Sequence, residues 1–511
     1  MKRPATATLL AGGAFLAGTI GIVSALTPDI ASRSDFVRGV LPTSVPETAR
    51  VLTLAFGIVL IWLSRGLRRR TRRAWQLAVL LVVASAFTHL AKALDFEEAM
   101  ATLVLLGALW GRRRDFTVPG DPQTIAPLLR TVGALAAVGA VAWLSPLPEG
   151  VGDAFGVIAI GVAMRVLYLW LRPIAQRYRQ SKDDRTRAEA IVREHGRDTL
   201  CFFKLRRDAA WFFSPSGSSF LAYRISGGTA VVGGDPVGAP EDVPALLRSF
   251  HTYAHEQGWR VAALGVSGKL LPVFRSVGFK SVYLGDEAIV HPGEFSLEGR
   301  RIRKVRQSVA RLERSGYRVR ILAADAVDAR TRAEVERVSR AWLAHSCERG
   351  FAMALDGLFA PETVLALAED EEGRLGGFVQ LVPSPATGGW SLSTSRRERD
   401  TPNGLMEFLI VRTLGWAHAG GAPELSLNFA VFGLMLRADA GWERLGRAVL
   451  LRFDRLFQLQ RLYGFSSKFG PEWRPRHLCF EAWGALPGPV LACLRAESLL
   501  TPPGPWVRRV A

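Results

Sequence analysis

The stretch RDTPNGLME, residues 399–407, combines two carboxylates with a turn at a predicted loop-to-helix junction. Asp400 and Glu407 flank the turn residue Asn403, and Arg399 precedes all three. Such a carboxylate could take a proton from a hydroxyl or orient an amine, and a guanidinium could meet a phosphate. We take Asp400 and Glu407 as catalytic candidates and Arg399 and Asn403 as substrate-binding candidates. On these residues alone, simple capping of the following helix is the competing interpretation.

Further polar candidates lie on or beside predicted strands. Ser426 and Asn428 alternate with apolar residues along LSLNFAVF, so they share one face of a strand and could line a pocket. Asp235 precedes a proline in GGDP, and Glu287 lies in GDEAIV. The alternatives are an ordinary solvent face for the first pair, an Asp-Pro turn for Asp235, and an edge-strand surface for Glu287.

Near the end of the chain, YGFSSKFGPEWRPRHLCF (463–480) mixes cations, aromatic rings and two prolines. This composition is unlike that of a core strand and suits a surface that binds phosphate beside stacking rings. We expect it to form a wall of the substrate pocket. Lys468 and Arg476 would neutralise a phosphate, and Trp473 would pack beneath them. A purely structural role is the alternative.

A second basic segment is predicted to be a helix, RRIRKVRQSVARLERSGYRVR, residues 300–320. Its apolar residues recur at helical spacing and define one buried stripe. The other faces carry cations, and the phosphate-binding candidates among them are Arg303, Lys304, Arg306 and Arg311. A solvated helix face is the alternative. The formal net charge of +19 favours anionic partners, namely nucleic acid, acidic lipid or both.

Cysteine and histidine spacing indicates no metal site. The four cysteines are scattered without a CxxC pair. His251 and His255 lie four residues apart on a predicted helix, but no third ligand is near them in the sequence. We therefore interpret them as a surface face and expect no bound metal.

The first third of the chain is apolar and predicts a membrane bundle. Candidate spans are 9–26, 49–64, 74–94, 99–111, 127–144 and 155–171, most of them near the ~20 residues that cross a bilayer. With six spans, the strong clusters of Arg and Lys all fall on one side, which is the cytoplasmic side by the positive-inside rule. We expect a multi-pass protein whose remaining residues lie in the cytoplasm.

From about residue 195 the pattern changes to alternating strands and helices. The order hairpin, loop, helix, strand occurs twice, and it resembles the GNAT acyltransferase fold in tandem. The loops GGDPVGAP and RDTPNG do not match the glycine-rich loop with which that fold holds the pyrophosphate of acyl-CoA. We expect no cofactor. The predicted domains are a transmembrane domain 1–176, a first GNAT-like subdomain 177–299, the linking helix 300–320, and a second subdomain 321–511 with the catalytic pocket.

Several stretches between about 230 and 480 resemble, in order, the catalytic domain of the MprF-type aminoacyl-phosphatidylglycerol synthases, also called phosphatidylglycerol lysyltransferases. They are VVGGDPVG, GDEAIV, FSLEGRRIRKVRQSVARLERSGYRV, WLAHSCERGFAMAL, RDTPNGLMEFLIV, LSLNFAVF and KFGPEWRPRHL. The pattern is most similar to the LysX type. The resemblance favours a catalytic role for Asp400 and Glu407, and it adds Trp342 and Glu348 to the substrate-binding candidates, with core packing as the alternative for these two.

The resemblance implies a reaction. An aminoacyl group passes from aminoacyl-tRNA to a glycerol hydroxyl of phosphatidylglycerol at the inner face of the plasma membrane. The aminoacylated lipid lowers negative surface charge and confers resistance to cationic antimicrobial peptides. The implied partners are therefore aminoacyl-tRNA, an anionic phospholipid and the membrane, and homo-oligomerisation is left open.

The sequence departs from the family at three points. Ser393 in LSTSRR stands where relatives carry an acid, which leaves the transferred amino acid open. No lysyl-tRNA synthetase follows, so we expect charged tRNA from another source, and the short membrane part gives no reason to expect lipid flipping. Three alternatives stay open: another lipid acceptor such as diacylglycerol, a non-catalytic basic membrane protein that binds RNA or anionic lipid, and an acyl-CoA-dependent GNAT enzyme.

Overall fold

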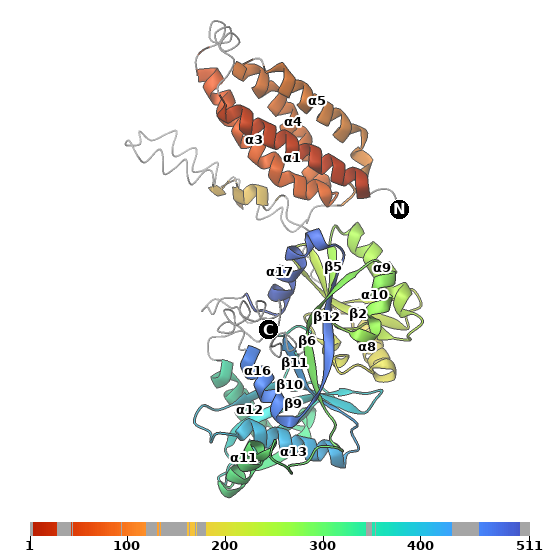
Figure 1. Ribbon diagram of the computed structural model, residues 1–511, viewed down its shortest axis with the longest axis vertical. Helices are drawn as coiled ribbons and strands as arrows, with labels where there is room; N and C mark the ends of the chain where they lie inside the picture. Colours follow the sequence, from red (N-terminus) through yellow and green to blue (C-terminus); the bar gives the residue numbers. More distant parts are fainter. Residues whose placement is uncertain are drawn as a thin grey trace, which may run out of the picture. The chain divides into compact units, whose positions relative to one another are not determined.

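The computed structural model describes residues 4–27, 44–93, 95–118, 180–343, 350–431 and 459–500, apart from Met353, together with Pro42 and a few positions between 130 and 170. The chain forms two compact units (Figure 1). Residues 1–176 belong to the first unit, and most of residues 177–511 belong to the second.

The first unit contains the helices α1 (Pro4–Leu26), α3 (Ser44–Arg68), α4 (Arg72–Ala93) and α5 (Phe96–Gly111). Three segments, Thr6–Leu26, Val45–Arg68 and Arg72–Ala91, are long and apolar enough to cross a membrane. The fourth expected span is the 16-residue α5, short of the ~20 residues that span a bilayer. The expected spans 127–144 and 155–171 lie largely outside the described residues, so the count of six stays a prediction.

Helices α1 and α3 approach each other closely at a pair of glycines. A Cβ atom on Gly18 would lie 2.6 Å from the carbonyl oxygen of Gly57, and the reverse distance is also 2.6 Å. Small residues at a helix crossing let two backbones meet, which is how apolar helices commonly pack inside membranes. Leu60, Leu63 and Leu67 of α3 continue the contact as buried core.

The second unit is built on one twelve-stranded sheet. Its strands are β1 (Ala210–Phe213), β2 (Ser219–Ser226), β3 (Thr229–Gly233), β4 (Val237–Gly238), β5 (Arg260–Ser267), β6 (Lys280–Val290), β7 (Arg318–Ala323), β8 (Val364–Glu369), β9 (Leu375–Ser384), β10 (Gly389–Arg397), β11 (Leu425–Val431) and β12 (Glu472–Phe480). Its helices are α8 (Lys182–His195), α9 (Val243–Glu256), α10 (Leu271–Ser276), α11 (Arg303–Arg314), α12 (Ala329–Leu343), α13 (Leu405–Ala419), α16 (Leu459–Ser466) and α17 (Pro487–Ala496).

The strand order β1-β2-β3-β5-β12-β6-β11-β10-β9-β8-β7 is symmetric about its centre, with β4 paired to β2 outside this path. In each half an antiparallel trio leads through one helix to a parallel strand, β3 to β5 through α9 and β10 to β11 through α13. The sequence repeat therefore corresponds to a structural one. The halves also exchange strands, because β12 from the end of the chain lies between β5 and β6.

The expectation that residues 463–480 are unlike a core strand is wrong for its second part, since β12 is central in the sheet. Proline normally excludes a central strand because it has no N–H to donate. Pro475 is tolerated here because the pairing of β12 with β5 begins only at Arg476, so at Pro475 the strand is paired with β6 alone.

The sheet of the second half is covered on both faces, and strand periodicity explains how. Along β8, Val364, Ala366 and Ala368 join the core under α11 and α13, whereas Leu365 and Leu367 join the core under α12. The expected apolar stripe of α11 is buried in the first of these cores. The hairpin between β2 and β3 turns at Gly227 and Gly228, both with positive φ, as a two-residue turn of this kind requires.

Candidate active site

The parallel strands β10 and β11 part soon after they meet. Their register joins only Trp390 with Leu425 and Ser391 with Ser426, yet β10 continues to Arg397 and β11 to Val431. We call the diverging segments, 392–397 and 427–431, the strand fork. Ligands of α/β proteins commonly bind at the carboxyl ends of parallel strands, and parted edges can hydrogen-bond a molecule laid between them.

A bulge in β11 shapes the fork. The register of β11 with β6 shifts between Ser426 and Phe429, and Asn428 lies between them with φ of 74°. Asparagine tolerates this left-handed conformation better than most residues. Its side-chain Nδ2 donates to the carbonyl of Leu392 at 2.9 Å, so it bridges the two strands where they begin to part.

The closed end of the fork is a buried polar cluster centred on Glu287. The hydroxyls of Thr199 and Ser426 donate to its Oε1 at 2.6 and 2.5 Å. Arg476 donates to its Oε2 through Nε at 2.9 Å and through a terminal nitrogen at 2.5 Å. Four donors saturate this fully buried carboxylate, so in this arrangement Glu287 is a support for Arg476 and not a free base.

Arg476 holds a second acid on its other side. Its guanidinium donates to both carboxylate oxygens of Asp198, at 2.6 and 3.3 Å, and to the hydroxyl of Thr199 at 3.1 Å. The side chain is 3% exposed and lies on the central strand β12. A buried cation is tolerated in protein only when it is paired and fully hydrogen-bonded, which is the case here.

Three ionisable groups of this cluster have displaced pKa values. Burial opposes ionisation of Asp198, but the charge and hydrogen bonds of Arg476 outweigh it and hold the pKa of Asp198 below its usual value. Burial, and then the negative charge of Asp198, raise the pKa of Asp235. Burial lowers the pKa of Lys204, against the attraction of Asp198. An acid whose pKa is raised beside an amine whose pKa is lowered is typical of sites that transfer protons.

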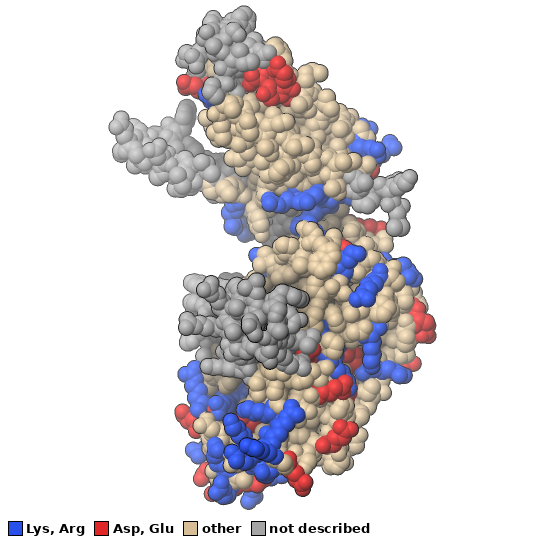
Figure 2. All heavy atoms as spheres, in the orientation of Figure 1, with Lys and Arg blue, Asp and Glu red and all other residues tan. Residues whose placement is uncertain are grey.

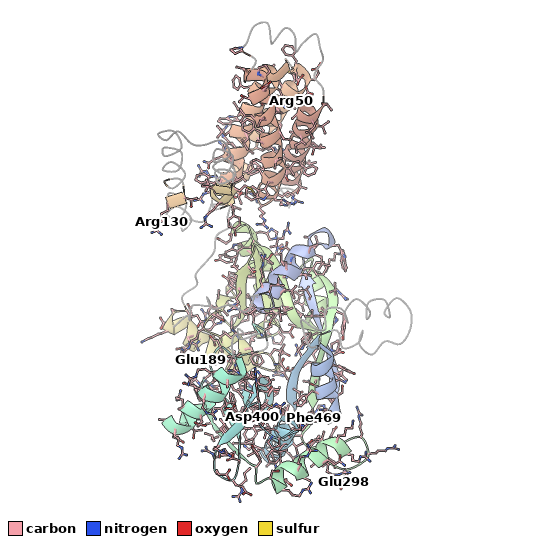
Figure 3. All side chains as sticks on the ribbon, turned by 90° about the vertical axis from the view of Figure 1, so that its left-hand side faces the viewer. Arg50, Arg130, Glu189, Glu298, Asp400 and Phe469 are labelled. Carbon is pink, nitrogen blue, oxygen red and sulfur yellow. The ribbon has the colours of Figure 1, made fainter. Side chains whose placement is uncertain are left out.

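The open end of the fork carries the RDTPNGLME stretch. Arg399 and Asp400 are exposed and lie on the loop between β10 and α13. Figure 3 labels Asp400. Helix capping does not explain Asp400, because the N-cap of α13 is Gly404, with φ of 98° and no side-chain cap hydrogen bond. Glu407, in the first turn of α13, accepts a hydrogen bond from Lys468 Nζ at 2.6 Å.

Lys468 also borders a cavity of about 330 Å³. The cavity is lined by His291, Arg300, Arg301, Ile302, Phe469 and other residues of the segments before α11 and β12. Its lining includes the basic side chains of Arg300, Arg301 and Lys468 and also the acidic side chains of Glu294 and Glu298. A phosphate-binding wall at residues 463–480 stays a prediction. The ring of Trp473, on β12, is stacked on the ring of Tyr463, with their centroids 4.7 Å apart.

The cations of α11, together with Arg300 and Arg301 before it, form a basic surface that includes part of the cavity wall. All of the following are exposed: Arg300, Arg301, Arg303, Lys304, Arg306, Arg311 and Arg314. Figure 2 shows basic side chains gathered over the part of the sheet unit where Figure 1 places α11. Arg311 additionally donates to the carbonyl of Asn403 at 3.1 Å, which ties this basic surface to the loop at the open end of the fork.

Most of the sequence-predicted residues lie at the two ends of the fork, whereas the cations Arg303, Lys304, Arg306 and Arg311 lie on α11 and Trp473 lies on β12. The closed end of the fork gathers Asp235, Glu287, Ser426, Asn428 and Arg476, and the open end gathers Arg399, Asp400, Asn403, Glu407 and Lys468. Trp342 is half exposed near the end of α12. Glu348 lies outside the described residues. Ser393, at the position that departs from the family pattern, accepts a hydrogen bond from the backbone of Leu355 at 3.1 Å.

Sequence reasoning missed Asp198, Thr199 and Lys204, which come from the segment before β1. A signal for Lys204 was available. The chain has 65 Lys and Arg residues but only eight lysines, so a lysine inside the apolar run CFFKL is unusual. Arginine does not lose its proton in proteins, whereas a buried lysine can. No spacing pattern distinguishes Asp198 and Thr199 from other loop residues.

Known sequences resemble this chain over most of its length. The sequence model of the family described as "Phosphatidylglycerol lysyltransferase, C-terminal" matches residues 189–480. The "Lysylphosphatidylglycerol biosynthesis bifunctional protein LysX" of Rhodococcus jostii is 32% identical over 491 residues, covering 85% of this chain and 43% of that protein. The protein of the same name from Nocardia farcinica is 37% identical over 311 residues, covering 59% and 28%. The chain thus spans less than half the length of these relatives.

Two solved structures resemble the sheet unit. The crystal structure of the C-terminal domain of a putative lysylphosphatidylglycerol synthetase from Agrobacterium fabrum is 27% identical, with a TM-score of 0.52, and the match covers 61% of this chain and 95% of that one. The structure of L-PGS from Bacillus licheniformis is 23% identical, with a TM-score of 0.55 and coverage of 63% and 97%, which supports the fold.

Proposed function

Because the chain belongs to the phosphatidylglycerol lysyltransferase family, we propose that it transfers an aminoacyl group from aminoacyl-tRNA to a glycerol hydroxyl of phosphatidylglycerol. The observation that carries this proposal is the strand fork with its two ends. A buried cluster that holds an acid of raised pKa and an amine of lowered pKa lies at one end, and basic side chains are linked to the other end through the Lys468–Glu407 ion pair and the Arg311–Asn403 hydrogen bond. Ester exchange between two anionic substrates needs both.

The proposed reaction requires proton transfer, and we assign that transfer to the closed end of the fork. The lipid hydroxyl attacks the ester carbonyl carbon, the bond from that carbon to the tRNA ribose oxygen breaks, the hydroxyl loses its proton and the ribose oxygen gains one. We assign the proton transfer to Lys204 together with Asp235. Burial displaces the pKa values of both groups; Asp198, which Arg476 holds in place, adds to the rise at Asp235 and opposes the fall at Lys204. Glu287 and Ser426 position Arg476, and Asn428 holds the fork.

The open end is assigned to the substrates' charged groups. We assign Asp400 to the amine of the aminoacyl group, and Glu407 to the orientation of Lys468 through their ion pair; direct catalytic roles for both stay predictions. Lys468, Arg300 and Arg301 border a cavity that Glu294 and Glu298 also line, and we assign these three cations to a phosphate of the lipid or of the tRNA 3′ end. The exposed cations Arg303, Lys304 and Arg306 extend this surface for a polyanion. Arg399, Asn403, Trp342 and Glu348 stay substrate-binding predictions.

The membrane part fits a lipid substrate. Three apolar helices of membrane-spanning length precede the sheet unit. We extend the proposal to a multi-pass protein of the plasma membrane with six spans, whose sheet unit lies in the cytoplasm, and to the boundaries 1–176, 177–299, 300–320 and 321–511. Each half of the sheet, in this proposal, is a GNAT-like unit.

The test uses the full chain in vesicles that contain phosphatidylglycerol, incubated with several labelled aminoacyl-tRNAs. We expect label in the lipid fraction that disappears when the tRNA is first digested with RNase. Labelling of diacylglycerol instead would keep the reaction and replace the acceptor. Labelling that survives RNase, or no labelling with any aminoacyl-tRNA, would overturn the proposal.

Substitution of Lys468 by alanine is expected to lower transfer roughly ten- to a hundredfold, since a hydrogen bond to a charged group contributes about 1.5–3 kcal/mol. The initial rate of lipid labelling measures the effect, and the circular dichroism spectrum should not change. Lys182→Ala, an exposed lysine at the start of α8, is the control and should retain full activity. Equal rates for both variants would remove Lys468 from the site.

A further inference from the structure

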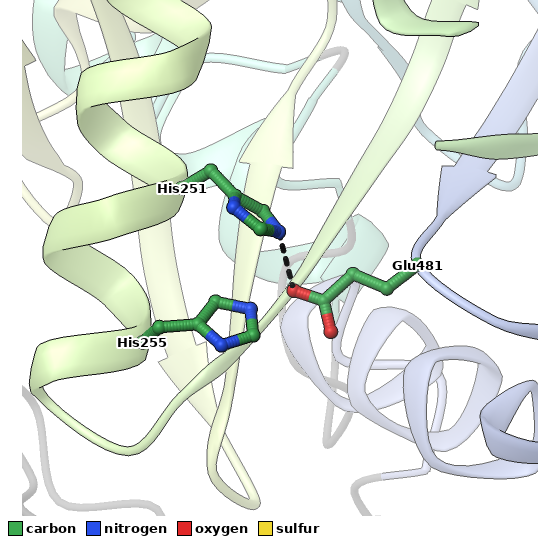
Figure 4. A group of neighbouring side chains, drawn as sticks. All are labelled: His251, His255 and Glu481. Carbon is green, nitrogen blue, oxygen red and sulfur yellow. Dashed lines mark ion pairs between the residues drawn. The ribbon is translucent and has the colours of Figure 1, made fainter. Parts of the chain in front are cut away.

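Helix α9 carries two histidines, and the fold brings a distant glutamate close to them. His251 and His255 are one turn apart in HTYAH, and Glu481 directly follows the last residue of β12. One ligand atom from each of the three side chains lies within 4.8 Å of the others. Both imidazoles and the carboxylate point toward one another (Figure 4). The expectation that the pair is only a surface face rested on the lack of a third ligand, and the fold supplies one.

The position of these side chains is partly fixed before any ligand arrives. His251 Nε2 lies 3.5 Å from Glu481 Oε1, and the same oxygen accepts a hydrogen bond from the backbone N–H of Val261 at 3.0 Å. The ring of His251 packs edge-on against Phe279, with centroids 5.6 Å apart. Ordered ligands lose less entropy when they bind a metal, and hydrogen-bonded carboxylates are typical of such sites.

We propose that His251, His255 and Glu481 form a binding site for a divalent transition metal of the zinc class. Two imidazole nitrogens and one carboxylate oxygen are ligands that zinc accepts, with water as the fourth ligand. Imidazole donors disfavour magnesium and calcium, which prefer oxygen ligands alone. All three side chains are at least partly exposed, so an ion can reach them from solvent.

The site is separate from the proposed reaction centre, and the proposal does not depend on the transfer activity. Glu481 is five residues beyond Arg476 on or after β12, a distance of roughly 16 Å at about 3.3 Å per residue. A bound ion would join α9, from the first half of the sheet unit, to the end of β12, the strand contributed by the second half. Its expected role is therefore to stabilise the strand exchange between the halves.

The experiment uses the full chain, purified in detergent without a histidine tag and stripped with a chelator. Titration with Zn²⁺, followed by calorimetry, should show one equivalent bound, and Zn²⁺ should raise the thermal midpoint of unfolding. Titration with Co²⁺ should give visible d–d bands without a thiolate charge-transfer band, because none of the three proposed ligands is a cysteine. Failure to bind one equivalent of either ion would overturn the proposal.

Three variants locate the site. His251→Ala, His255→Ala and Glu481→Gln should each weaken Zn²⁺ binding at least about tenfold, since even the loss of an outer-shell partner costs that much. Glu481→Gln keeps an oxygen to accept the Val261 N–H, so its folding should be unaffected. The control is His195→Ala. His195 also lies near a glutamate, 3.6 Å from Glu194, but among the described residues it belongs to no group of three possible metal ligands. Equal affinity in His255→Ala and His195→Ala would place the bound ion elsewhere and reject the site.

Discussion

Arg476→Met should lower the free energy of opening of the central strands by about 3–5 kcal/mol, the usual cost of removing one member of a buried ion pair. The substitution keeps most of the side-chain volume but leaves Glu287 and Asp198 buried without their cation. Amide hydrogen exchange along β6 and β12 measures this opening without requiring the membrane helices to unfold.

Two further variants separate the charge from the packing. Arg474→Met changes the same residue type two positions away on the same strand, where the side chain is about one-third exposed and pairs with Glu424 and Glu472. Exposed pairs contribute ~0–1 kcal/mol, so this loss should be small. The double variant Glu287→Gln/Arg476→Met should lose less than the sum of its single variants, because the two residues interact directly. Similar losses at positions 474 and 476 would contradict the assigned role of the buried network.

The predictable parts of this fold are those encoded over short distances. The apolar stripe of α11, the β2–β3 hairpin at Gly227-Gly228 and the strand of Ser426 follow from periodicity and turn chemistry within about twenty residues. The placement of β12 does not. It pairs with β6 about 190 positions earlier in the chain, and its proline and cations contradict every local rule for a central strand.

The two ends of the candidate site differ in the same way in how well the sequence predicts them. The open end of the fork is one contiguous motif, so residues 399–407 were visible as a unit. The closed end assembles residues from four separate segments, and no spacing relates the segments: Asp198 with Lys204, Asp235, Glu287 and Arg476. Residue types alone predicted part of the closed end, because Glu287 and Arg476 were each identified as candidate site residues. Buried polar side chains need partners, but nothing in the sequence indicated that these two residues are partners.

Substitutions of Lys204 should affect the transfer rate and the stability of the fold in different ways. Lys204→Met should lower transfer by about 10²–10⁴-fold, the usual contribution of a positioned acid or base. Lys204→Arg should be similarly inactive, because arginine keeps its charge and cannot take up the proton. Stability should not fall with activity. Burial lowers the pKa of Lys204, so the unfolded chain binds this proton more tightly than the folded chain does. The charged amine therefore destabilises the folded state. Methionine carries no charge, so Lys204→Met removes this destabilisation.

The pH profile tests the same assignment. The groups that face Lys204 are Asp198, Cys201, Asp235 and Arg476, of which Asp198 and Asp235 raise its pKa and Arg476 lowers it. A neutral amine accepts the proton, so transfer should rise with pH as Lys204 deprotonates, and the rise should begin below the ordinary lysine range. In Asp198→Asn the attraction for the charged amine is weaker, which lowers the pKa of Lys204 further and moves the rise to lower pH. A profile that is the same in this variant as in the parent protein, or a Lys204→Met variant with full activity, would show that the buried amine is only part of the core.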